Sequence, residues 1–282
     1  MMSSRDNETL ATIYNNIASV YGEQAKYDQA LHYFKLSLQV KLNCKPSDHP
    51  SIATTYHNLA CIYAAKLYYD ESIKAAESAV AILNQCPPNT FPGLAAVYTN
   101  LGYSYYRVNQ LDRAEDYLQQ SITLLRSMYK IQDDNHYKFA FTYNILALVK
   151  CAQGSFEEAE YLCQKSSNLL LKELPSDSVD VGLSYETFGI IYNAQKKYEQ
   201  ALLFFYKSET IIRCVSDEYP LLVRIFREIG TVFYNQTIYD RALEFYTKAI
   251  GLALKVYETN TKLIDSLTYD LDRVIDHVLT IE

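Results

Sequence analysis

The chain has 282 residues and a formal net charge of −7, and its basic and acidic residues are well mixed. This balance argues against a nucleic-acid partner, because general nucleic-acid binding needs an excess of lysine and arginine to displace counterions. Only 8 glycines and 7 prolines occur while 49% of the residues are hydrophobic, so the sequence favours helices over sheets, which need many turn residues.

The first ten residues, MMSSRDNETL, contain no apolar stretch like that of a signal peptide, and no later run of about 18 apolar residues could span a membrane. We therefore expect a cytoplasmic protein without membrane insertion. No Cys-x-x-Cys pair occurs, so we expect the cysteines to be reduced, partly buried small hydrophobic residues. They are found at positions 44, 61, 86, 151, 163 and 214.

We find none of the motifs that mark a catalytic serine, a zinc-dependent hydrolase or a phosphate-binding loop. The five histidines are scattered, and we expect none of them to bind a metal ion. These observations predict a protein that is not an enzyme and that holds no cofactor and no metal.

A repeated pattern runs along the chain. Its first copy places Tyr14, Ile17, Ala18 and Tyr21 on one face of a predicted helix, and Ala30 follows on a second helix. Later copies begin at Tyr56, Tyr98, Tyr143, Tyr185 and Phe226, with spacings of 42, 42, 45, 42 and 41 residues. Six copies at a nearly constant period indicate a stack of similar helix pairs.

Each copy also carries two small residues twelve positions apart, which would let its two helices approach closely. The pairs are Ala18 and Ala30, Ala60 and Ser72, Gly102 and Ala114, Ala147 and Ala159, Gly189 and Ala201, and Gly230 and Ala242. A short turn separates the two helices. The 27 tyrosines of the chain would fill the wedges between successive units.

The aromatic and small positions resemble those of the tetratricopeptide repeat over about residues 10–256. The repeats are longer than the usual 34 residues, and the Asp48-His49-Pro50 element at a unit boundary is similar to that of kinesin light chain repeats. No heptad coiled coil precedes the array, as it would in a complete kinesin light chain. The resemblance implies an all-α fold: a right-handed α-solenoid of antiparallel helix pairs, the tetratricopeptide superhelix.

The pattern predicts an N-terminal flank, six repeats and a terminal helix. Their boundaries are 1–9 for the flank, 10–44, 52–86, 94–130, 137–174, 180–215 and 220–257 for the repeats, and 260–282 for the last helix. In that last segment Leu267, Leu271 and Val274 belong to an apolar stripe, which indicates a capping helix, since the end of a solenoid must be covered. A partner-binding amphipathic helix is the alternative.

The resemblance implies that the first helix of each pair lines a concave groove that receives a peptide or helix of a partner. The predicted groove residues are Asn15, Asn16, His57, Asn58, Thr99, Asn100, Tyr103, Arg107, Asn144, Asn193, Arg224 and Arg227. Asn16, Asn58 and Asn100 recur at one position of the first three units, and their amides could pair with a peptide backbone. Bonding between neighbouring helices is the alternative interpretation of these asparagines, and the two do not exclude each other.

Kinesin light chain arrays bind short acidic motifs built around an aromatic residue, so the resemblance implies such a ligand. Arg107, Arg224 and Arg227 are the residues that could receive its carboxylates. We therefore expect a peptide-binding adaptor similar to a kinesin light chain cargo-binding domain. A structural scaffold of a larger complex, or the regulatory part of an enzyme whose catalytic domain is absent, are the alternatives, and the sequence leaves the oligomeric state open.

Overall fold

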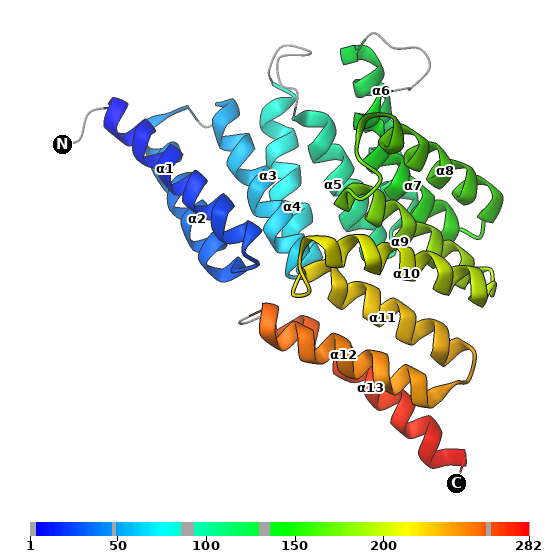
Figure 1. The fold of residues 1–282 in the computed structure, drawn as a ribbon. Coiled ribbons are helices and arrows are strands. Elements are labelled where there is room, and N and C mark those ends of the chain that lie inside the picture. Colours follow the sequence, from blue (N-terminus) through cyan, green and yellow to red (C-terminus); the bar gives the residue numbers. More distant parts are fainter. Residues whose placement is uncertain (1–3, 47–48, 86–92, 130–135, 258–260, 282) are drawn as a thin grey trace. The chain divides into compact units, whose positions relative to one another are not determined.

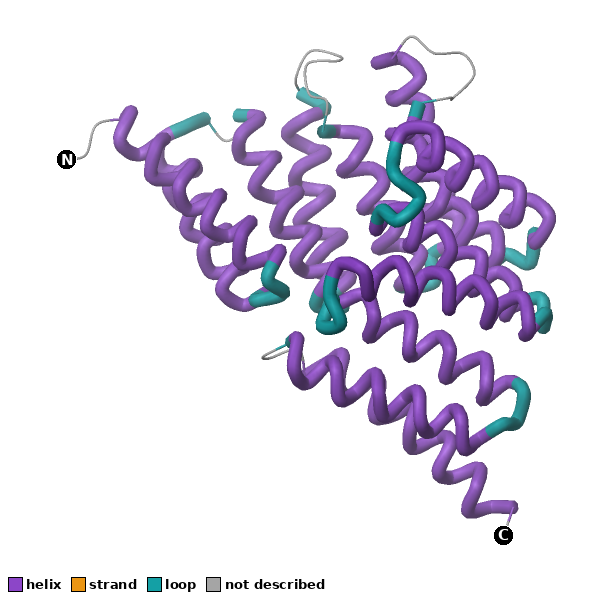
Figure 2. Tube along the Cα trace, viewed as in Figure 1, coloured by secondary structure: helices purple, strands orange, loops and turns teal. Residues whose placement is uncertain are grey.

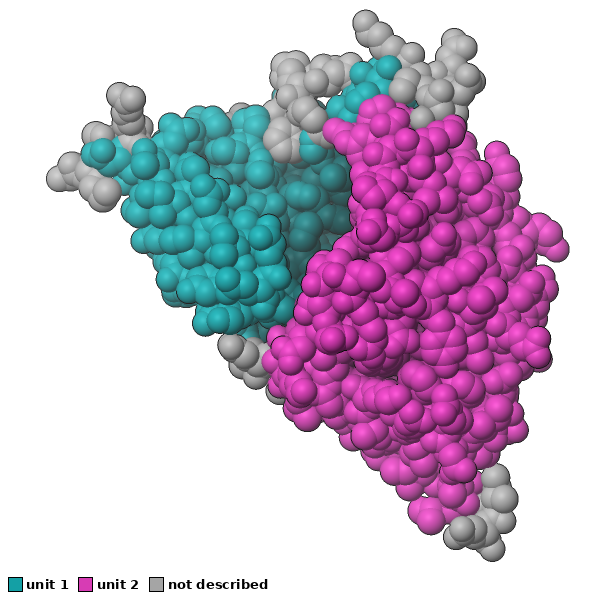
Figure 3. Space-filling model, in the orientation of Figure 1, with its two compact units in different colours: residues 1–134 teal, residues 135–282 magenta. Residues whose placement is uncertain are grey.

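The computed structural model describes residues 4–46, 49–85, 93–129, 136–257 and 261–281. Within these ranges the chain forms thirteen α-helices and one short 3-10 helix, and no strand (Figure 2). The chain divides into two compact units, unit 1 over Met1–Asp134 and unit 2 over Asn135–Glu282 (Figure 3).

Each unit consists of antiparallel helix pairs that stack in chain order (Figure 1). Unit 1 contains α1 (Ser4–Glu23), α2 (Tyr27–Cys44), α3 (Pro50–Ala65), α4 (Tyr69–Leu83), α5 (Leu94–Arg107) and α6 (Leu111–Tyr129). Unit 2 contains η1 (Tyr137–Phe139), α7 (Ala140–Ala152), α8 (Phe156–Glu173), α9 (Val179–Ala194), α10 (Tyr198–Val215), α11 (Pro220–Asn235), α12 (Tyr239–Val256) and α13 (Thr261–Ile281).

Odd-numbered helices up to α11 are the first helices of pairs, and even-numbered helices are the second. Each second helix also packs on the first helix that follows it within its unit. These contacts confirm the predicted all-α solenoid. The exact repeat boundaries stay a prediction.

The predicted small residues lie where the paired helices cross. Ala18, Ala30, Ala60, Ala147 and Ala159 are 0% exposed. At Gly189 even a methyl group has no room, because an added Cβ would lie 2.6 Å from Cε1 of the buried Phe205. The repeat pattern therefore encodes the separation of the helices, which in turn lets the large aromatic residues close over the contact.

A buried serine ties the two helices of four pairs together. Its hydroxyl donates to the carbonyl oxygen of the residue 26 positions earlier, on the first helix of the pair. The bonds run from Ser37 to Ala11 (2.7 Å), from Ser121 to Ala95 (2.9 Å), from Ser166 to Ala140 (2.8 Å) and from Ser208 to Gly182 (2.7 Å). The remaining two pairs have Ala79 and Ala249 at this position.

The turn inside every pair has the same backbone conformation. One residue in each takes a positive φ, and these residues are spaced like the repeats: Ala25, Leu67, Asn109, Gly154, Lys196 and Thr237. In the fifth turn the amide of Lys197 donates to the carbonyl of Tyr192 at 2.8 Å, which closes the end of the helix with a left-handed residue inside the loop. Only one of the six is glycine, so tertiary packing imposes this conformation on residues that disfavour it.

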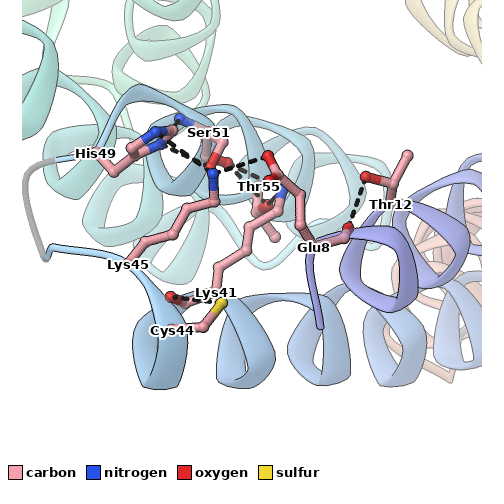
Figure 4. A network of polar contacts seen from close by, with 8 residues as sticks. All are labelled: Glu8, Thr12, Lys41, Cys44, Lys45, His49, Ser51 and Thr55. Atoms are coloured by element: carbon pink, nitrogen blue, oxygen red, sulfur yellow. Dashed lines mark hydrogen bonds and ion pairs between the residues drawn. The ribbon is translucent and has the colours of Figure 1, made fainter. Parts of the chain in front are cut away.

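The joint between the first two pairs contains a buried lysine (Figure 4). The Lys41 ammonium group on α2 donates to the Ser51 carbonyl at 3.0 Å and to the Thr55 hydroxyl at 2.7 Å, both on α3. Lys45 bonds Glu8 of α1 at 2.8 Å and lies 3.4 Å from the ring of His49. His49 accepts the Ser51 amide and so caps α3, whose first residue is a proline.

The last helix, α13, takes the place of a first helix. Arg227 and Tyr234 of α11 bond Asp270 and His277 of α13, each 43 residues later. In the same register Ile229, Gly230 and Phe233 correspond to Asp272, Arg273 and Asp276, all three exposed. The helix thus packs against the array with Leu267 and Val274 fully buried. On the face where each earlier first helix packs against its second helix, α13 presents charged residues instead. This arrangement fits the predicted cap.

We predict opposite effects for two glycine-to-alanine changes within helices. Gly189→Ala should lower the free energy of unfolding by about 1–3 kcal/mol, since its methyl group overpacks the Phe205 contact. Gly251→Ala should raise it by up to about 1 kcal/mol, because its Cβ would meet no atom within 4 Å and alanine favours the helix. Urea unfolding of both variants measures the two signs, and equal signs would contradict this view of the contact.

We also predict that replacing Lys41 changes stability in a pH-dependent way. Burial, followed by repulsion from Lys45, lowers the pKa of the Lys41 ammonium from its ordinary value of 10.5. The folded chain therefore holds this proton less tightly than the unfolded chain does, which lowers the free energy of unfolding. This loss has its full size at pH values below the pKa of Lys41 in the folded chain. It disappears as the pH rises towards 10.5, the pKa in the unfolded chain.

Lys41→Met removes this loss, so the variant should compare more favourably with the unchanged chain at neutral pH than at a pH near 10.5. Urea unfolding of the two chains at both pH values gives the comparison. The same stability difference at both would show that the ammonium group has no such penalty.

Candidate functional site

The first helices of unit 1 share a polar surface, which we call the first-helix face. It comprises Asn15, Asn16, His57, Asn58, Cys61, Asn100, Tyr103 and Arg107 of α1, α3 and α5. The Asn58 amide donates to the Asn15 side chain at 3.3 Å, and the Asn100 amide lies 3.0 Å from the Cys61 sulfur. Two of the three predicted ladder asparagines thus bond between neighbouring first helices, while Asn16 is exposed.

His57 and Cys61 lie one turn apart at the centre of this face. The Nε2 atom of His57 is 3.9 Å from the Cys61 sulfur. Burial lowers the pKa of His57 and raises the pKa of the Cys61 thiol to about 11, so both side chains are neutral near pH 7. A thiol in this state is a poor nucleophile, and the pair forms a polar packing contact and not a reactive dyad.

Arg107 is held in place at one end of the face. Its guanidinium group lies 4.7 Å from the centre of the Tyr69 ring, and it donates to the Tyr103 hydroxyl at 2.8 Å. These contacts fix the guanidinium group beside two aromatic rings. Tyr69 comes from a second helix, and the sequence pattern of the first helices did not reveal its role.

Two predicted groove residues lie elsewhere. Thr99 is only 2% exposed, and its hydroxyl bonds Ser121 of α6 at 2.9 Å, so it belongs to the contact inside its own pair. Asn144 is 8% exposed and donates to the Leu183 carbonyl at 3.4 Å, between α7 and α9. The prediction was wrong for both. These residues lie at the border between the buried and the exposed face of their helix, and a small rotation of the helix about its axis decides which face they join.

The arginines of unit 2 are already paired with carboxylates. Arg224 forms a two-pronged ion pair with Glu186 of α9, whose side chain is 3% exposed. Arg227 donates to Asp270 at 2.6 Å and to Ser266 at 3.0 Å. The expectation that these arginines stand ready for the carboxylates of a ligand is therefore corrected: they join neighbouring helices within unit 2.

Asn193 also bonds along the array, because it accepts the amide of Asn235 at 3.0 Å on the exposed side of α9 and α11. This contact spans 42 residues, the length of one repeat. A search of the sequence for opposite charges or paired amides one repeat apart could have found such contacts.

Five of the six cysteines are free thiols, and Cys86 lies outside the described residues. Cys151 and Cys163 are buried as predicted, whereas Cys214 is exposed and corrects the expectation for that position. Among the residues that the structure describes, no three His, Cys, Asp or Glu side chains gather closely enough for a metal ion. No described helix is long and apolar enough to cross a membrane.

Comparison with known proteins agrees with this architecture. A sequence model of the tetratricopeptide repeat matches residues 9–85 and 138–213, and a second tetratricopeptide repeat model matches residues 94–136. The chain therefore belongs to the tetratricopeptide repeat family. No curated protein matches it.

Solved structures with the same fold include kinesin light chain-like arrays. A Podosopora anserina protein described as a kinesin light chain with nearly identical repeats is 20% identical over 75% of this chain and 97% of its own, with a TM-score of 0.57. BtubC (BKLC) from P. vanneervenii is 15% identical over 85% and 90%, with a TM-score of 0.52. A Rap protein complexed with competence and sporulation factor is 13% identical over 94% and 76%, with a TM-score of 0.65.

We predict that removing one partner of the Glu186–Arg224 pair destabilises the fold much more than replacing both partners. Arg224→Met should lower the free energy of unfolding by about 2–4 kcal/mol, because it leaves the Glu186 carboxylate buried without its countercharge. The double variant Glu186→Gln with Arg224→Met should recover most of this loss. Urea unfolding of the singles and the double gives the coupling energy, and a coupling near zero would contradict the pairing.

Proposed function

We propose that this chain is a protein-interaction adaptor that binds a peptide or helix of a partner across the first-helix face of unit 1. The single observation that carries the proposal is the row of amides on successive first helices, of which Asn16 is exposed and Asn58 and Asn100 are half-buried. An amide offers both a donor and an acceptor, so it can bond a peptide backbone whatever the side chains of the ligand are. Membership of the tetratricopeptide repeat family supports a binding role in general.

The end of the face at Arg107 favours an aromatic or acidic residue in the ligand. The guanidinium group is stacked on Tyr69 and bonded to Tyr103, so it loses little conformational freedom when it binds a carboxylate. The kinesin light chain-like arrays and the Rap protein with its bound factor are consistent with a peptide ligand. Because Arg224 and Arg227 are paired internally, the acidic preference rests on Arg107 alone.

A structural scaffold is the second candidate. The observation that favours it is the set of large apolar side chains exposed on second helices of unit 2, such as Tyr161 at 65%, Leu203 at 52% and Leu254 at 63%. Apolar side chains that form one contiguous patch on a surface mark a site where another folded protein binds. The two functions use different helices, so substitutions separate them.

A triple variant, Asn16→Ala, Asn58→Ala and Asn100→Ala, should lose most of its partners in a quantitative affinity purification. We expect at least about a tenfold reduction of each groove-bound partner, equivalent to about 1.4 kcal/mol. The matched control changes exposed amides on second helices of the same unit: Gln39→Ala, Asn43→Ala and Gln119→Ala. If the triple variant folds and retains every partner, the first-helix face is not the binding surface.

A further inference from the structure

A surface pocket in unit 2 is lined by none of the residues discussed as ligand-binding above. Its volume is about 320 Å³, and its lining comes from α10, α11, α12 and Asp217 in the loop after α10. Phe226 and Leu252, which are 6% and 9% exposed, supply apolar surface. Arg213, Lys248 and Lys255 supply positive charge, and Asp217 supplies one negative charge. The volume is at the lower end of the range of ligand pockets, roughly 300–1,000 Å³, and suits one large side chain.

A glycine borders this pocket in the middle of a helix. Gly251 lies in α12, and a Cβ built on it would meet no atom within 4 Å. Glycine inside a helix costs about 1 kcal/mol relative to alanine, and packing against the rest of the chain does not require it here. What glycine does achieve at this position is to leave the pocket unobstructed.

The charges around the pocket are weakly engaged. Arg213 pairs with Glu209 at 2.9 Å and with Asp217 at 2.5 Å, and Lys248 pairs with Glu244 at 2.6 Å. All three pairs link residues four apart. The Arg213–Asp217 and Lys248–Glu244 pairs lie on exposed surface, where such pairs contribute little, whereas the Glu209 side chain is 17% exposed. No described residue forms an ion pair with Lys255, so an incoming carboxylate can bind it directly and compete with Asp217 for Arg213.

The cations also lie beside the aromatic surface. The Arg213 guanidinium is 5.5 Å from the centre of the Phe226 ring, and the Lys248 ammonium is 4.6 Å from that of Phe245. Apolar surface and positive charge thus occur within the reach of one short peptide.

We propose that this pocket is a second docking site, which receives one bulky apolar side chain of a partner peptide flanked by aspartate or glutamate. The apolar surface of Phe226 and Leu252 takes the side chain, and Arg213, Lys248 and Lys255 take the flanking carboxylates. Because the site is formed by α10, α12, Asp217 and Phe226 of α11, it shares no residue with the first-helix face of unit 1.

The probe for this site is a fluorescein-labelled peptide, Asp-Asp-Phe-Asp-Asp, titrated against the full chain at low ionic strength and followed by fluorescence anisotropy. Gly251→Leu adds a large side chain at the border of the pocket, where its Cβ meets no atom within 4 Å, and should weaken binding by at least about tenfold. Gly251→Ala should change it by less than about threefold. Lys248→Glu should weaken binding several-fold, whereas Lys207→Glu, the same charge change at the equivalent position of α10, should not.

Three results would overturn the proposal. They are no binding by the unchanged chain at roughly millimolar concentration, binding that Gly251→Leu leaves intact in a folded variant, and equal binding of an Asn-Asn-Phe-Asn-Asn peptide. The Asn16, Asn58 and Asn100 triple variant should bind the probe like the unchanged chain. A negative result for the pocket therefore does not contradict the proposal for unit 1. A negative result for the first-helix face likewise does not contradict the proposal for the pocket.

Discussion

The close approach of two helices at a pair of small residues is the constraint on which the rest of this structure depends. Where Gly189 of α9 meets α10, the ring of Phe205 fills the space that a methyl group would need. Small residues occupy the corresponding positions of every pair, which lets the two helices of a pair approach closely. In the first, third, fifth and sixth pairs, aromatic residues of both helices contact each other beside this position. Four of the six pairs add a serine bond between their helices, and all six turns contain a residue with positive φ.

The stacking of pairs relies on a second set of contacts, which run between first helices. Asn58 bonds Asn15, Asn100 bonds Cys61, and in unit 2 the buried Glu186 binds Arg224. These bonds connect residues about one repeat apart, so the polar surface that we propose as the binding face also joins the repeats. A ligand that uses these amides must either share their remaining donors and acceptors or replace the existing bonds.

The sequence predicted the helix pairs well because their signal is local and repeated. Tyr14, Ala18 and Ala30 define a contact that any helical pair with these residues can form. It did not predict the bond from Ser37 to the Ala11 carbonyl, since a serine on a helix has no pattern that reveals an acceptor 26 residues earlier. The sequence also misplaced Thr99, whose side chain is buried between α5 and α6. It did not reveal that Arg224 pairs with Glu186.

A local perturbation tests most directly whether repeated close contacts hold the array together. In a solenoid each repeat contacts only its neighbours, so Gly189→Ala should speed amide hydrogen exchange in α9 and α10 and, less strongly, in the helices packed on them. Exchange in α1–α6 should be unchanged. Hydrogen–deuterium exchange followed by mass spectrometry measures this, and either an unchanged α9–α10 pair or a uniform increase along the whole chain would contradict the role assigned to the contact.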